Sequence, residues 1–218
     1  MIIASAAIGG RNPQVIYTDT EFGTANASSY SVTAAFGDAS PRRYIIIGFQ
    51  AGQLGADLNQ PDSCSAGGVA ASLVATSGAT GTAWKQIWIT DSPVPTGTSG
   101  TVAIARSGGN MTHGIIHVWA AYDILSVTAV GTVNGAFANP STGSLTTAAN
   151  GIAVGHSTTT TAGSWTVGGL TEDAEGTGSG TGATTQWAAA SFFKTSAGSI
   201  SVSFSQAASN AFIAASFQ

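Results

Sequence analysis

Ser199-Ile200-Ser201-Val202-Ser203-Phe204-Ser205 is the stretch of sequence that decides the fold class. Its apolar residues alternate with serines, so a strand here would place the apolar side chains on one face and the serines on the other. The segment 101–106 alternates in the same way. A period of two residues predicts β-strands that have one face on a core and one face in solvent.

Other apolar segments are continuous, which is typical of strands that are covered on both faces. These segments are 44–49, 115–119 and 212–215. Clusters of Gly, Ser, Thr, Asn and Pro separate them, as at 93–97 and 176–180, and helical periodicity is hard to find. The sequence therefore predicts an all-β fold, an antiparallel β-sandwich that is jelly-roll-like or otherwise Greek-key.

Strand-like segments of the first half recur in the same order in the second half. The pairs are 30–35 with 144–149, 44–49 with 151–155, 68–73 with 165–170, 84–88 with 186–192, the strands from 101 and 199, and 115–122 with 211–217. We expect an internally duplicated six-strand unit, with repeats at 28–122 and 144–218. No Pro-rich or charged linker separates the repeats, which favours one sandwich domain (28–218) of about a dozen strands over two small sandwiches.

Composition excludes several classes of function. Only 7% of residues are charged and the net charge is −4, which argues against the basic surface that nucleic-acid binding needs. Cys64 is the single cysteine, so neither a disulfide framework nor a thiolate zinc cage is expected within the chain. The longest apolar run is far shorter than the ~20 residues of a membrane-spanning helix, so no membrane insertion is expected.

Catalytic motifs are missing as well. The sequence has no Gly-x-Ser-x-Gly elbow, no Walker A loop and no Gly-x-Gly-x-x-Gly fingerprint. A serine–histidine arrangement assembled only in space stays an alternative. We expect no enzyme activity and no cofactor.

Two patterns in the sequence resemble metal-binding sites. His113 and His117 are four residues apart, but on a strand that spacing is ~13 Å, too far for two ligands of one ion. We expect His117 to be a partly buried strand residue and His113 to lie in a turn. Glu172, Asp173 and Glu175 form an acidic cluster that could bind calcium or simply be solvated. No metal site is predicted.

Trp84, Gln86 and Trp88 share one face of a predicted strand. Core packing, a subunit interface and glycan stacking are all open for this face, because tryptophan is common in interaction hot spots and aromatic faces beside amides suit sugars. We expect Trp119, Trp165 and Trp187 to belong to the core.

Residues 1–27 are predicted to form an N-terminal arm that docks on neighbouring proteins. The arm is apolar at Ile2, Ile3 and Ile8, and Arg11, Arg42 and Arg43 in or near it are candidates for binding an acidic partner surface. The alternative is that Val15–Thr18 forms the first strand of the chain's own sandwich.

Several phrases resemble a group of Ser/Thr/Ala/Gly-rich virion proteins of tailed phages. They are Gly67–Val74 (GGVAASLV), Pro95–Val102 (PTGTSGTV), Gly169–Asp173 (GLTED) and Ala214–Phe217 (AASF). The resemblance covers the chain from about Pro13. It implies a non-enzymatic particle component, in the range of head decoration, head fibre or tail fibre.

The low charge points in the same direction, because a chain presented in fixed copies on a particle needs less charge to stay dispersed. We expect a structural protein on the virion exterior, either a capsid decoration (cement) protein or a head fibre. Its expected partners are other virion proteins and copies of itself. The alternative is a carbohydrate-binding receptor module of a tail fibre or tail tip, with a host surface glycan as partner.

Overall fold

A computed structural model of the chain describes residues 12–24, 26–52, 60–77, 83–111, 113–180 and 183–218. All regular structure in these residues is β-strand, and every strand pair is antiparallel, which confirms the expected all-β sandwich class. The described residues include no helix that could cross a membrane.

Sixteen strands follow one another along the described chain. They are β1 (Gln14–Gly23), β2 (Ser29–Ala35), β3 (Arg43–Gly52), β4 (Ser63–Ala66), β5 (Val69–Thr76), β6 (Ala83–Thr90), β7 (Ser99–Ala105), β8 (His113–Tyr122), β9 (Gly131–Asn134), β10 (Ser141–Thr147), β11 (Gly151–Thr159), β12 (Thr166–Gly168), β13 (Thr171–Gly180), β14 (Ala183–Lys194), β15 (Gly198–Ser205) and β16 (Ala211–Phe217).

The first eight strands form one sheet in the order β1-β8-β3-β6-β5-β4-β7-β2. This sheet curls over, so that β1-β8-β3-β6 and β5-β4-β7-β2 face each other across a core, and β1 comes back beside β2. Two four-stranded halves with this order are a jelly roll.

The last eight strands repeat the same order with each number raised by eight. They form a five-stranded sheet, β13-β14-β11-β16-β9, and a three-stranded sheet, β10-β15-β12. The expected repeat unit of six strands is therefore too small: each unit has eight. The chain has two stacked jelly rolls, where we expected one sandwich of about a dozen strands.

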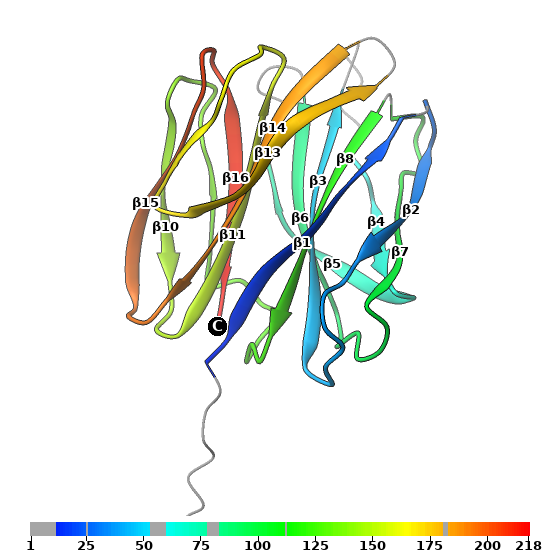
Figure 1. Cartoon of the computed structure of the whole chain (residues 1–218), viewed down its shortest axis with the longest axis vertical. Coiled ribbons are helices and arrows are strands. Elements are labelled where there is room, and N and C mark those ends of the chain that lie inside the picture. The colour runs from blue at the N-terminus through cyan, green and yellow to red at the C-terminus, as the bar shows by residue number, and fades with distance from the viewer. Residues whose placement is uncertain (1–11, 25, 53–59, 78–82, 112, 181–182) are drawn as a thin grey trace, which may run out of the picture.

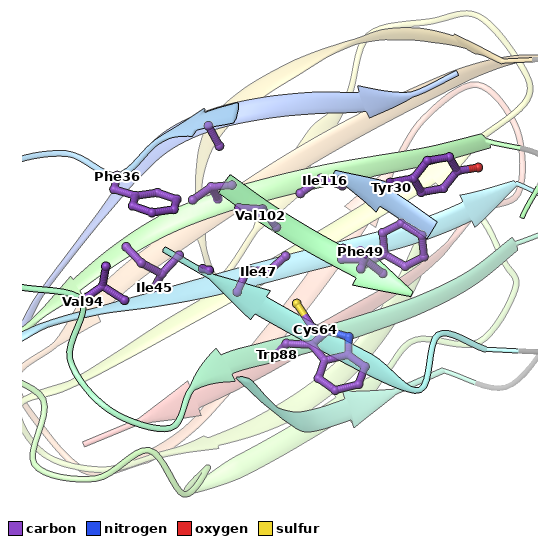
Figure 2. Packing of buried hydrophobic residues seen from close by; sticks show 14 of the residues in the cluster. Tyr30, Phe36, Ile45, Ile47, Phe49, Cys64, Trp88, Val94, Val102 and Ile116 are labelled. Atoms are coloured by element: carbon purple, nitrogen blue, oxygen red, sulfur yellow. The ribbon is translucent and has the colours of Figure 1, made fainter. Parts of the chain in front are cut away.

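The β1-β8-β3-β6 half of the first jelly roll stacks against the five-stranded sheet of the second, which gives four layers of strands with three apolar layers between them (Figure 1). The first core lies inside the first jelly roll and contains Phe36, Ile47, Cys64 and Trp88 (Figure 2). The second core lies inside the other jelly roll and contains Trp165 and Phe204, among others. We call the apolar layer between the two jelly rolls the middle layer; its members include Ile46, Ile87, Trp119, Val154, Trp187 and Ile213.

This stacking explains why some strands are apolar at successive positions. In β3, Ile45, Ile47 and Phe49 point into the first core, whereas Ile46 points into the middle layer. A strand between two apolar layers has no solvent face, so its sequence loses the alternation that a surface strand keeps. In β15, Val202 and Phe204 are buried and the alternate serines are not, as its period of two predicts.

The structure corrects two expectations, one about the N-terminal arm and one about a loop. β1 pairs with β8 along Gln14–Gly23, and Ala27 bonds to Met111, so this part of the expected arm belongs to the first jelly roll, and the alternative of a first strand near Val15–Thr18 is the arrangement present. Residues 176–180, expected as a loop, belong to β13.

Candidate functional site

The polar groups that could do chemistry gather in the middle layer. All three histidines of the chain are buried. His117 on β8 and His156 on β11 come from different jelly rolls, and their ring centroids lie 5.2 Å apart. Both are fully buried, more than expected for His117, and His113 is the first residue of β8, not part of a turn.

Hydrogen bonds hold each ring by one nitrogen. His156 Nε2 donates to the Gln86 carbonyl oxygen at 3.2 Å, because a carbonyl can only accept. His117 Nδ1 lies 3.1 Å from Thr20 Oγ1, and the Thr20 hydroxyl is also bonded to the Tyr17 hydroxyl. The other nitrogens, His156 Nδ1 and His117 Nε2, have no hydrogen-bond partner among the described residues.

Aromatic rings and one glycine shape the space around the pair. The ring centroids of Trp187 and Trp119 lie 5.1 and 5.9 Å from that of His117. Gly48 on β3 makes room for the second ring, since a Cβ there would lie 2.9 Å from His156 Cδ2 and 2.9 Å from Trp119 Cζ3. Gly48 and His156 lie on equivalent strands of the two jelly rolls. In the first, Gly48 on β3 pairs with Ile87 on β6 and His117 on β8. In the second, His156 on β11 pairs with Ala189 on β14 and Ile213 on β16.

Burial keeps the two imidazoles neutral. It lowers the pKa of His117 well below its usual range, and the neighbouring His156 adds to that effect. Burial, with the nearby Lys85, lowers the pKa of His156 to about 3. Lys85 itself is buried, and its pKa falls to about 8 for the same reason.

A carboxylate near this region is engaged elsewhere. Asp173 accepts hydrogen bonds from Trp119 Nε1 and from the Ser191 hydroxyl, both at 2.9 Å, and partial burial raises its pKa. The Thr20–His117 contact therefore lacks the carboxylate that orients the histidine in a hydrolase triad. Among the described residues no three His, Cys, Asp or Glu side chains come together as a metal site. The histidine pair therefore offers two neutral imidazoles, each with one ring nitrogen that has no hydrogen-bond partner among the described residues.

The arginines expected to bind a partner have other roles or lie outside the description. Arg43 is fully buried, and its guanidinium donates to the carbonyl oxygens of Val94, Gly37, Asp38 and Thr96 at 2.9–3.0 Å. It is a structural clamp, because a buried guanidinium cannot meet a partner. Arg42 is 56% exposed and pairs with Asp123 at 3.1 Å. Ile2, Ile3, Ile8 and Arg11 lie outside the described residues.

The glycan or interface candidates do not form a surface. Gln86 and Trp88 are buried, and Trp88 Nε1 donates to Gln86 Oε1 at 3.2 Å. Trp88 packs in the first core (Figure 2), so core packing is its role. Trp84 is partly exposed. Trp119, Trp165 and Trp187 are buried, as expected.

The acidic cluster is on a strand. Glu172, Asp173 and Glu175 belong to β13, which has a bulge between Glu172 and Ala174. Glu175 accepts a hydrogen bond from the Trp165 backbone N–H at 2.7 Å. Two of the three carboxylates thus bind protein donors, and the expected open loop is absent.

The sequence interpretation missed that His156 joins His117, because nothing in the spacing of residues 117 and 156 indicates contact. One usable signal was the polar residue on an apolar strand face: Lys85 shares its face with Ile87 and Ile89. Comparison of the chain with protein-family models, with curated proteins and with solved structures gives no match.

Proposed function

We propose that the chain is a non-enzymatic structural protein on the exterior of a bacteriophage particle, as a capsid decoration (cement) protein or a head fibre. The observation that supports this most is the jelly-roll strand order of both halves of the chain, because viral capsid domains use the jelly-roll fold. The stack of the two jelly rolls is a stiff body that carries loops at both ends for contacts with partners.

The placement of charged groups fits the same role. Arg43, Arg106 and Lys85 are buried, and the two arginines donate to backbone carbonyls of their own chain. Their charges therefore serve the fold and leave few for keeping free molecules apart in solution. Display at fixed positions on a particle removes that need.

Carbohydrate binding is the alternative function, and the experiment described below distinguishes it from the proposed role. Jelly rolls also build lectins. However, the face that was the candidate for sugar stacking is buried at Gln86 and Trp88.

The test is to locate the protein in particles of the phage that encodes it. We expect gradient-purified particles to contain it in a fixed ratio to the major capsid protein, and gold-labelled antibodies to decorate intact heads. Particles lacking it should assemble but release DNA at a lower temperature. Labelling confined to the tail, with glycan binding by the purified chain, would favour the receptor module. Absence from purified particles would refute both.

A further inference from the structure

We propose that the His117–His156 pair is an acid-sensitive lock, which holds the two jelly rolls together while neutral and releases their contact when it takes up protons. The pair bridges the jelly rolls directly, since His117 belongs to β8 and His156 to β11 and their rings lie 5.2 Å apart. This inference does not depend on the proposed function.

The groups that face the pair offer no compensation for a positive charge. β1 contributes Tyr17 and Thr20, β14 contributes Trp187, and β6 contributes Lys85, which is itself a base. Of the carboxylates nearby, Asp173 on β13 is bonded to Trp119 and Ser191, and Asp19 on β1 accepts from the backbone of Thr20 and Ala35. A further positive charge buried beside Lys85 would find no partner and would be repelled by it, so protonation of the pair favours an open middle layer.

The opening should be confined to the middle layer. Each jelly roll has an apolar core of its own, and neither the first nor the second core contains a histidine. Acid thus removes the contact between the jelly rolls before it unfolds either of them. The two would then move apart on the chain that joins β8 to β9.

Proton counting makes the proposal quantitative. Burial keeps the pKa of both histidines below its usual range in the closed form, and exposure on opening would restore the ordinary value of about 6.5. Below that value the open form binds more protons, so each histidine should raise the opening constant about tenfold for each pH unit of acidification. The pair should therefore give about a hundredfold per unit between roughly pH 5.5 and 4.

Thiol labelling can measure this opening. Ala121→Cys introduces a thiol into the middle layer, where Ala121 is fully buried, and the natural Cys64 in the first core is an internal control. A dithiodipyridine, which still reacts with thiols in acid, labels position 121 at a rate proportional to the opening constant when closing is fast. We expect position 121 to react as the pH falls while Cys64 stays protected.

Substitution of each histidine shows which residues bind the protons that drive the opening. His156→Gln keeps a donor for the Gln86 carbonyl and His117→Asn keeps a group for Thr20, but neither titrates. Each should reduce the pair's contribution from about a hundredfold to about tenfold per pH unit, and the double variant should abolish the contribution of the pair. His113→Gln removes the third buried histidine, which contacts Thr185 of β14 and has a pKa lowered by burial, so it measures any contribution of His113 separately. Ile46→Val, in the middle layer and without a titrating group, is the control and should leave the slope unchanged.

Two results would overturn the proposal. One is simultaneous labelling of Cys64 and position 121, which would mean that the chain unfolds as a whole. The other is a slope that is unchanged in His156→Gln and His117→Asn. The slope of the protein with both histidines present is itself a test, so the proposal stays falsifiable if the double variant does not fold.

Discussion

Arg43 and Arg42 are adjacent in the sequence, yet they do different work in the fold. The Arg43 guanidinium is buried and bonded to four carbonyl oxygens from the segments 37–38 and 94–96. Arg42 makes a surface ion pair with Asp123. At the scale of single residues, burial and bonding decide their roles, because both carry the same charge.

Arg43→Ala should lower the free energy of unfolding by about 3 kcal/mol or more, because it leaves buried carbonyl oxygens without donors. Arg43→Lys should recover only part of the loss, since an ammonium cannot copy the planar fork. Arg42→Ala is the matched control, with an expected loss below about 1 kcal/mol for an exposed pair. Urea denaturation measures all three; equal losses at positions 42 and 43 would show that the clamp contributes nothing special.

Gly48 is the second residue with a sharp prediction. Gly48→Ala should destabilise the chain by about 1–3 kcal/mol, because the added methyl group would meet the rings of His156 and Trp119 at 2.9 Å. Gly108→Ala is the control, since a Cβ there meets nothing within 4 Å, and its effect should stay within about 0.5 kcal/mol. The melting temperatures of the Gly48→Ala and Gly108→Ala variants, measured by thermal unfolding, compare the two effects. A neutral Gly48→Ala would mean that the middle layer is loosely packed.

At the scale of elements, β13 shows how packing overrides local turn chemistry. Its run of glycines and small polar residues reads as a loop, yet it pairs with β14 through Gly180. The glycines are there because large side chains cross the strand: a Cβ at Gly176 would meet Trp187 at 2.7 Å, and one at Gly178 would meet Phe22 at 2.6 Å. Glycine within a strand often marks such a close approach.

Truncation tests the role of β1, which the sequence analysis had grouped with the preceding residues as one N-terminal arm (1–27). Removing residues 1–11 should leave the circular dichroism spectrum and melting temperature unchanged, because β1 begins at Gln14. Removing residues 1–23 should destroy cooperative unfolding, since it strips β1 from β8 and exposes the middle layer. If the proposed function holds, the shorter truncation should also lose particle binding. A folded chain without β1 would contradict the prediction.

At the scale of the whole molecule, the middle layer couples stability to pH. Lys85 has a pKa of about 8 in the folded chain and an ordinary value of 10.5 when exposed. Between these values the unfolded chain binds more protons, so the contribution of Lys85 to stability rises as the pH rises from 8 to 10.5. Below pH 8 the folded chain holds a buried charge.

Lys85→Met should therefore increase the free energy of unfolding at pH 7, by about 1–3 kcal/mol, because a buried cation is replaced by an apolar side chain of similar volume. This advantage should shrink as the pH approaches 10.5. Denaturation at pH 7, 8.5 and 10 measures the difference. Lys194→Met, at the far end of β14, is the control for the loss of a lysine that is only partly buried. An advantage that is constant with pH would contradict the assignment.

Sequence by itself determined the strand class, because the alternation at 199–205 and the apolar runs at 44–49 and 115–119 depend only on which faces of a strand are covered. It also indicated the order of the repeated segments. Only the tertiary structure decided that the repeats are eight-stranded, that the β1-β8-β3-β6 half of the first stacks on the five-stranded sheet of the second, and that His117 meets His156. These are contacts between residues far apart in the chain, and a periodic pattern shows that a face is buried without showing what lies against it.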